Sequence, residues 1–150
     1  MNNLKNHNLI DLTAISVTNI FNIIMVAVFI FRTLQTRHLQ GVGIVWVMFI
    51  ATLGIVIFRN IQAKRGRWFI ILPLLMWIFL IIEVVLDYVL RLDFRNTSLI
   101  GPYLLLYYIS ILGMIGYSFL VEKKYGFITL VTYFLSQFAA LYSYIKVGHG

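Results

Sequence analysis

The sequence predicts an all-α fold, namely an integral membrane protein whose five transmembrane helices form a bundle. Hydrophobic residues make up 61% of the 150 residues and charged residues 11%, whereas soluble domains are about 45–50% apolar and about 25% charged. The apolar residues fall into five runs of 18 to 23 residues. Each is long enough to cross a hydrocarbon core of about 30 Å as a helix. The runs, which together make one domain, are residues 9–31, 41–58, 68–90, 99–121 and 127–145.

The third run, Trp68 to Leu90, contains two acids, Glu83 and Asp87, and we expect the other helices to pack about it. Sixteen of its 23 residues are Leu, Ile, Phe or Val. These favour insertion by about 5 to 10 kcal/mol, against at most about 7 kcal/mol for two acids. An intramembrane carboxyl usually faces a bundle interior or a wet cavity. Glu83 is therefore either a buried structural acid or the site of a proton, cation or solute.

Asp87 has a cation within reach directly after the same predicted helix. It shares a face with Glu83 at a spacing of four residues, and Arg91 continues that row one turn later. We therefore expect Asp87 and Arg91 to form a structural ion pair near the membrane boundary.

The first run carries an unusual number of polar residues in its first half. Asp11, Thr18 and Asn22 fall on one helical face, with Asn19 beside them. Amides in hydrocarbon need partners, so this face should turn towards other helices. Its role is either interhelical hydrogen bonding or solute contact. In the second case Asn19 and Asn22 would bind the substrate together with Glu83.

Two further runs have a side of small residues that lets a neighbouring helix approach closely. In the second run this side consists of Gly43, Val47, Ala51 and Gly54. In the fifth run a hydroxyl-rich stripe consists of Thr129, Thr132, Ser136, Ala140 and Ser143. The stripe predicts either a packing seam or a solute track.

The connecting segments are basic, and five helices place the two termini on opposite sides. The N-terminal tail with segments 59–67 and 122–126 carries seven Lys or Arg, whereas segments 32–40 and 91–98 with the C-terminal tail carry five. The positive-inside rule therefore favours a cytoplasmic N-terminus in the cell (inner) membrane. The cations lie between apolar runs, where they meet lipid headgroups, so they indicate no nucleic-acid partner.

Residues for cofactor or catalytic chemistry are scarce. Cysteine is absent, and the histidines His7, His38 and His149 lie in tails and loops. No phosphate-binding glycine loop or nucleophile–base set is visible. We expect no metal, no cofactor and no enzymatic activity, which argues against a lipid-modifying enzyme.

One segment resembles a known family. The sequence from Arg32 to Arg37, then Gly41 and the apolar run to Gly54, is similar to the first loop and second helix of the PQ-loop family of SWEET and SemiSWEET sugar transporters. The resemblance covers residues 28–58, with Val28-Phe29 where that family has Pro-Gln. It implies three-helix repeats around a mid-membrane solute site that opens alternately to each side.

These patterns favour a transporter for a small solute, or a proton-coupled one, with Glu83 as its mid-membrane acid. The alternative is a non-catalytic accessory subunit that packs against partner membrane proteins or copies of itself. Neutralising Glu83 discriminates between them, because a carrier would lose flux and an accessory subunit would lose assembly.

Overall fold

Five helices account for almost all of the chain that the structure describes. The computed structural model describes residues 2–34, 42–92 and 97–147, apart from the side chains of residues 2–8 and 42, and these parts contain no strand. The helices are α1 (Asn2–Thr33), α2 (Val42–Gln62), α3 (Trp68–Val84) with the π-helical turn η2 (Val85–Val89), α4 (Ile100–Val121) and α5 (Lys123–Val147). All five spans are long and apolar enough to cross a membrane. The predicted all-α five-helix bundle is confirmed.

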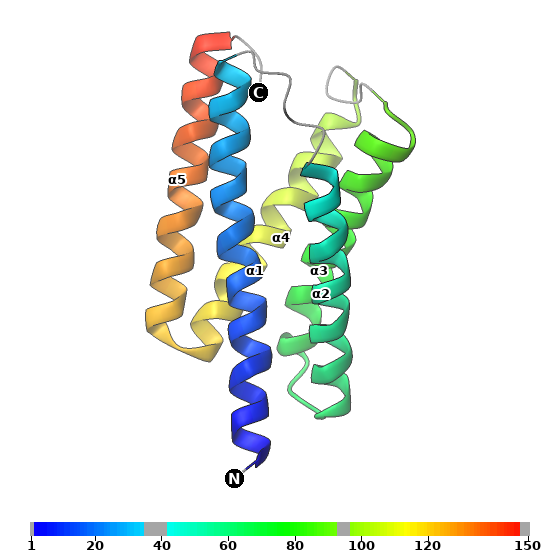
Figure 1. Ribbon diagram of the computed structural model, residues 1–150, viewed down its shortest axis with the longest axis vertical. Helices are drawn as coiled ribbons and strands as arrows, with labels where there is room; N and C mark the ends of the chain where they lie inside the picture. The colour runs from blue at the N-terminus through cyan, green and yellow to red at the C-terminus, as the bar shows by residue number, and fades with distance from the viewer. Residues whose placement is uncertain (1, 35–41, 93–96, 148–150) are drawn as a thin grey trace.

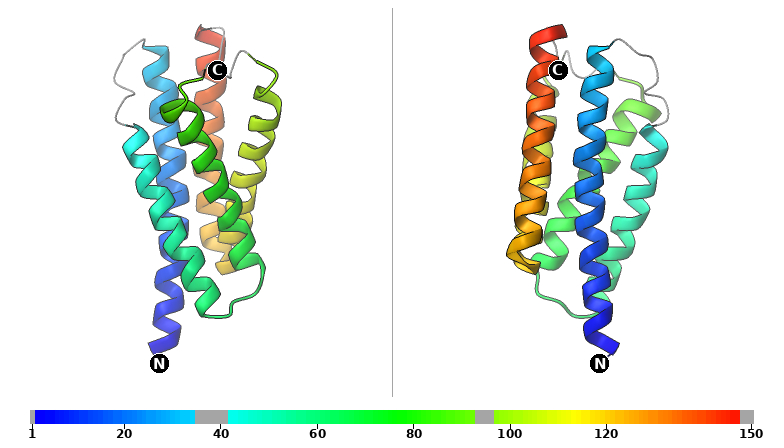
Figure 2. Two further views of the ribbon diagram at one scale, coloured as in Figure 1. Left: turned by 90° about the vertical axis from the view of Figure 1, so that its right-hand side faces the viewer. Right: turned by 60° about the vertical axis from the view of Figure 1, so that its left-hand side comes forward.

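The helices run alternately up and down, so the termini lie at opposite ends of the bundle (Figure 1). Contacts between helices follow a ring in which α2 packs on α3, α3 on α4, α4 on α5, α5 on α1, and α1 on α2. Figure 2 shows α1 beside α5 and α2 beside α3 in both further views. The end that holds the start of α1, the α2–α3 connection and the α4–α5 turn is called the first end below.

The helix at the centre of the packing is α4, not α3 as expected from the sequence. In Figure 1 it crosses the bundle obliquely, from beside α3 to beside α5. It also contacts α1 across the ring and is the most buried of the five spans. Two glycines make this crossing close, because Gly113 and Gly116 lie against Leu72 of α3. Helix α3, which contains Glu83, therefore packs beside the central helix α4.

The core is built from large side chains that meet edge to face. Phe21 of α1 lies 5.0 Å from the ring of Trp46 in α2 and 6.2 Å from that of Phe79 in α3, measured between ring centroids. Phe79 in turn contacts Tyr107 of α4 at 5.5 Å. Tilted and edge-to-face rings at these separations are favourable arrangements for aromatic pairs. One aromatic chain thus connects four of the five helices.

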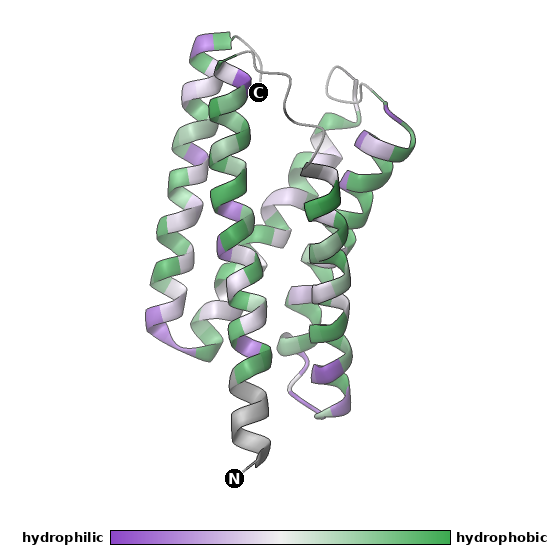
Figure 3. Cartoon of the chain, in the orientation of Figure 1, coloured by the Kyte–Doolittle hydropathy of each residue, from purple (hydrophilic) through white to green (hydrophobic). Residues whose placement is uncertain are grey.

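The outward faces are apolar and uncovered. Ile44, Leu105, Phe138 and Ile145 are 62 to 71% exposed, and Figure 3 shows hydrophobic residues along the outside of the spans. A soluble monomer rarely exposes apolar patches of more than a few hundred Å². This surface suits lipid, and the chain is membrane-embedded.

Three predicted boundaries differ in the structure, all at the first end. Helix α2 continues four residues past Phe58, to Gln62. The expected polar tail of residues 1–8 is helical from Asn2, so α1 begins seven residues before the apolar run. The expected turn at 122–126 shrinks to Glu122, the one extended residue between α4 and α5. This tight connection needs Gly126, since a Cβ there would come within 2.3 Å of the Phe119 ring. Hydropathy marks the membrane core but does not mark where a helix stops.

In α1, α3 and α4 the packing is looser towards the second end. The last buried residue of α1 is Asn22 although the helix continues to Thr33. In α3 the last is Leu80, and in α4 the first is Tyr107. Glu83 and the start of α4 therefore belong to a half-buried region, in contrast to the close-packed first end.

Candidate functional site

Glu83 lies in the last turn of α3, between the buried core and the second end. It is partly buried, and its Oε2 accepts a hydrogen bond from the Tyr103 hydroxyl at 2.5 Å. Tyr103 is in the first turn of α4, and its ring centroid lies 5.7 Å from that of Phe79. The carboxyl therefore stands on the aromatic core, with a phenol from the neighbouring helix as one partner.

The helix changes its geometry directly after Glu83. The turn Val85–Val89 is π-helical, and the amide of Leu90 donates to the carbonyl of Val85 at 2.8 Å. Such widened turns are rare and occur frequently at functional sites. The widening inserts one residue per turn and so re-aims the side chains that follow, among them Asp87.

The expectation that Arg91 continues the helical row of Glu83 and Asp87 is wrong, because the helix has ended by then. Arg91 has a left-handed backbone with φ of 50°, and the Leu92 amide bonds back to the Leu86 carbonyl at 3.0 Å. This is a helix termination around a left-handed residue. The four-residue spacing that motivated the pair does not apply, and the Asp87–Arg91 ion pair stays a prediction.

Asn19 and Asn22 face α5, as expected of amides that need partners. The Thr132 hydroxyl donates to Asn19 Oδ1 at 2.7 Å, and Asn22 Nδ2 donates to the Thr132 hydroxyl at 3.0 Å. Asn19 Nδ2 also reaches the Thr129 hydroxyl at 3.3 Å. These bonds join α1 to α5 across about 110 residues of sequence, which supports the interhelical role.

One atom of this group is left over. Asn22 is fully buried, yet its Oδ1 has no hydrogen-bond partner among the described residues. A buried acceptor without a partner is uncommon, because its desolvation is uncompensated. The amide of Asn22 is therefore able to accept a further donor inside the bundle.

The hydroxyl stripe of α5 also lies inside. Thr129, Ser136 and Ser143 are fully buried, and Thr129 donates to Ser118 of α4 at 3.0 Å. Nearer the second end, Gln137 donates from Nε2 to the Tyr107 hydroxyl at 3.2 Å. The stripe thus packs against both α1 and α4, and its solute-track alternative is untested.

The predicted site residues do not form one cluster of direct contacts. Glu83 bonds to α4, whereas Asn19 and Asn22 bond to α5. The two groups are connected through the aromatic core, since Phe79 touches both Tyr103 and Phe21.

The predicted small side of α2 is used in part. A Cβ on Gly43 would come within 2.5 Å of the Tyr88 ring, and a Cβ on Gly54 would lie 3.5 Å from Trp77 Nε1. Trp77 donates to the Ile50 carbonyl of α2 at 2.9 Å. Val47 and Ala51 are exposed instead, so the close α2–α3 approach is made at the two glycines.

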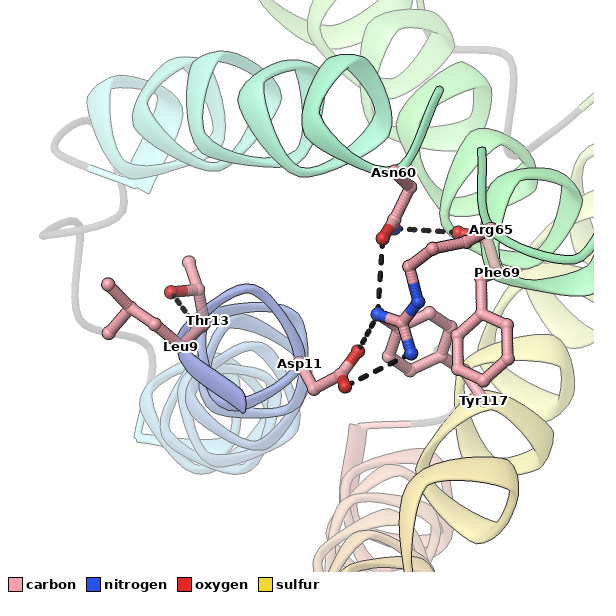
Figure 4. Close-up of polar contacts among 7 residues, drawn as sticks. All are labelled: Leu9, Asp11, Thr13, Asn60, Arg65, Phe69 and Tyr117. Atoms are coloured by element: carbon pink, nitrogen blue, oxygen red, sulfur yellow. Dashed lines mark hydrogen bonds and ion pairs between the residues drawn. The ribbon is translucent and has the colours of Figure 1, made fainter. Parts of the chain in front are cut away.

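The strongest polar contact in the described chain was missed by the sequence reasoning. Arg65, in the α2–α3 connection, forms two bonds with Asp11 of α1, at 2.5 Å from Nη1 to Oδ1 and 3.1 Å from Nη2 to Oδ2 (Figure 4). The Tyr117 hydroxyl donates to the same Asp11 Oδ1 at 2.7 Å. Three segments thereby meet at the first end.

The Arg65 guanidinium is held on its other sides too. Its carbon lies 3.8 Å from the centroid of the Phe69 ring, and Nη1 donates to Asn60 Oδ1 at 3.2 Å. Asn60, itself fully buried, uses its amide to bond the Phe69 carbonyl at 2.8 Å. Bidentate pairing and stacking on a ring are the geometries that arginine makes and lysine does not.

A signal for this cluster was present in the sequence. Because each predicted helix crosses the membrane once, Asp11, the basic segment 59–67 and the end of the fourth run lie at the same membrane boundary. An acid near the start of the first run therefore faces the densest cations of the chain. The cation that pairs with Asp11 is decided by the conformation of the α2–α3 connection. The spacing of residues in the sequence does not predict that conformation.

No known protein family, no curated protein and no solved structure matches this chain. Similarity of residues 28–58 to the PQ-loop repeat stays a hypothesis, and part of the loop that carries it, residues 35–41, lies outside the described residues. The same holds for His38 and His149, and the side chain of His7 is likewise outside them. Among the described residues, no group of three or more His, Asp or Glu side chains is placed to hold a metal ion.

Proposed function

We propose that the protein is a small membrane carrier that moves a small solute or a proton, with Glu83 as its ion-handling group. The observation that carries the proposal is the position of this carboxyl within a transmembrane span, bonded to Tyr103 beside a π-helical turn. An acid at this depth is costly and is a functional candidate by default. The half-buried surroundings of the second end are compatible with access from that side.

The Asn22 carbonyl oxygen supports a solute contact deeper in the bundle. It is fully buried and has no partner among the described residues. We propose that a solute that has passed Glu83 donates a hydrogen bond to this oxygen, with Asn19 held in place by α5. In this proposal Glu83 and Asn22 act in succession, since they do not contact each other directly.

The accessory-subunit alternative has less support. The small and hydroxyl residues that would bind a partner helix, such as Gly126, Thr129 and Ser136, are buried against the protein's own helices. Its outward faces are mainly Leu, Ile, Phe and Val, which suit lipid as well as a partner. If this alternative holds, the protein associates with copies of itself through those apolar faces.

We further propose that the protein resides in the cell (inner) membrane with a cytoplasmic N-terminus. The first end carries more cations than the second, and cytoplasmic loops carry the excess of Lys and Arg.

The test is flux in vesicles that contain the purified protein, with a pH-sensitive dye inside and a panel of small solutes outside. We expect the wild type to exceed empty vesicles, Glu83→Gln to fall to their leak rate, and Tyr103→Phe to lie between. Glu122→Gln is the matched control, because it removes an acid exposed at the α4–α5 turn. All variants should elute as the same folded species.

Two results would overturn the proposal. One is wild-type flux equal to the leak of empty vesicles for protons and for every solute. The other is full flux in a folded Glu83→Gln protein, which would leave the carrier without its ion-handling group.

A further inference from the structure

The first end of the bundle carries a surface of exposed cations, which we call the basic end. It consists of Arg59, Lys64, Arg67, Lys123 and Lys124. Arg65 also lies here, but its charge is used by Asp11. Glu122 is the one other acid at this end within the described residues, so the exposed surface is strongly positive.

The second end is different. Its described cations are Arg32, Arg91 and Lys146, and the described acids in the half of the bundle towards this end are Asp87 and the deeper Glu83. Charge on the two ends is therefore unequal, even though both ends meet a membrane boundary. The helix-dipole preference places cations at helix C-termini, of which the second end has three (α1, α3 with η2, and α5) and the first end two (α2 and α4). It therefore does not explain the excess of cations at the first end.

The two basic segments of the first end lie at the same membrane boundary. Helices α3 and α4 run antiparallel in a constant register, since Glu83 meets Tyr103 near one end and Phe69 contacts Tyr117 near the other. Figure 3 shows the α2–α3 connection and the α4–α5 turn as hydrophilic segments of the same end. Their cations therefore face the headgroups of the same leaflet.

Apolar surface begins immediately beside these cations. Trp68, which follows Arg67, is 51% exposed, and Leu120 and Phe127 on either side of the α4–α5 turn are 51% and 60% exposed. The Arg67 guanidinium lies 5.5 Å from the Trp68 ring, and Lys124 Nζ lies 5.8 Å from the Tyr125 ring. A ligand that satisfies both features carries a negative charge next to a hydrocarbon chain.

We infer that the basic end is a docking surface for anionic phospholipids of the leaflet that it faces. The phosphate and acidic headgroup pair with Lys64, Arg67, Lys123 and Lys124, and the acyl chains lie along the exposed apolar residues of α3, α4 and α5. Clustered cations beside a transmembrane helix are the pattern by which proteins select acidic lipids. This surface is separate from Glu83 and does not depend on transport.

The experiment measures lipid binding to the full-length protein in neutral detergent by native mass spectrometry. Phosphatidylglycerol is compared with phosphatidylcholine of the same acyl chains, and glycerol phosphate serves as the headgroup without chains. We expect phosphatidylglycerol to bind tightest, with an affinity that falls as salt rises. Equal affinity for phosphatidylcholine, or for glycerol phosphate, would overturn the inference.

Variants locate the surface. Lys123→Gln with Lys124→Gln should weaken phosphatidylglycerol binding about 30-fold, at about fivefold for each cation near the membrane surface. Lys123→Arg with Lys124→Arg keeps the charge and should bind as the wild type does. Lys146→Gln, at the second end, should also leave binding unchanged. An equal loss on Lys146→Gln, or no loss in the double Gln variant, would contradict the placement.

Discussion

The Arg65 guanidinium forms two hydrogen bonds with the Asp11 carboxylate and lies over the Phe69 ring. Asp11 is 5% exposed, so its charge is nearly withdrawn from water. Desolvating both charges costs free energy, which the pair recovers only because its geometry is good and Tyr117 and Asn60 supply further bonds. The cluster fixes the relative position of α1, the α2–α3 connection and α4 at one membrane boundary.

Arg65→Gln should lower the free energy of unfolding by about 2 to 4 kcal/mol, because it leaves a buried carboxylate without its cation. Unfolding in detergent micelles, followed by circular dichroism, measures the change. The neighbouring Lys64 is exposed, so Lys64→Gln should have little effect.

A double-mutant cycle separates the Asp11–Arg65 pairing from general destabilisation of the first end. Asp11→Leu combined with Arg65→Met removes both charges and should cost less than the sum of the single changes. If the two effects add fully, or if Arg65→Gln unfolds as Lys64→Gln does, the ion pair does not hold the boundary together.

Gly126→Ala should destabilise the α4–α5 connection. The added Cβ would lie 2.3 Å from the Phe119 ring, and overpacking of this kind costs about 1 to 3 kcal/mol. Gly101→Ala is the control, because a Cβ there meets nothing within 4 Å. Phe119→Ala should relieve the clash in the double variant, and failure to do so would show that the ring is not the obstacle.

The α1–α5 seam should show measurable coupling between Asn19 and Thr132. A double-mutant cycle of Asn19→Ala and Thr132→Val is expected to give about 0.6 kcal/mol and at most about 2 kcal/mol, the range of hydrogen bonds between transmembrane helices. Ser16→Ala serves as the control, since Ser16 is exposed on α1. A coupling energy of zero would mean that the Thr132–Asn19 bond makes no net contribution.

Reporter fusions test the orientation. With the basic end on the cytoplasmic side, reporters inserted in 63–67 or fused after Glu122 should be cytoplasmic and one fused after Gly150 external. If every reporter gave the opposite location, the protein would have the inverted orientation, with its basic end at the external leaflet.

Hydropathy alone predicts the number, type and approximate span of the helices, because insertion is decided by summed transfer free energy. The inward face of α1 also follows from sequence, since Asn19 and Asn22 need partners in hydrocarbon. Arg65 could not be chosen among neighbouring cations, because the loop conformation selects it. The π-helical turn after Glu83 was also missed, because amino-acid composition does not mark a turn that contains one extra residue. For the same reason the sequence did not reveal that the helix ends before Arg91.

The α1–α5 hydrogen bonds also bear on how the protein is made. Thr129 and Ser118 lie 11 residues apart and can pair as soon as the α4–α5 hairpin leaves the translocon. Asn22 and Thr132 are 110 residues apart, so the hydrogen bonds between α1 and α5 form only after the last helix is synthesised. The first helix to be synthesised is thus among the last to complete its hydrogen bonds. A nascent chain arrested before α5 would present Asn19 and Asn22 to membrane chaperones and proteases without their α5 partners. Asp11 would already have its partners Arg65 and Tyr117.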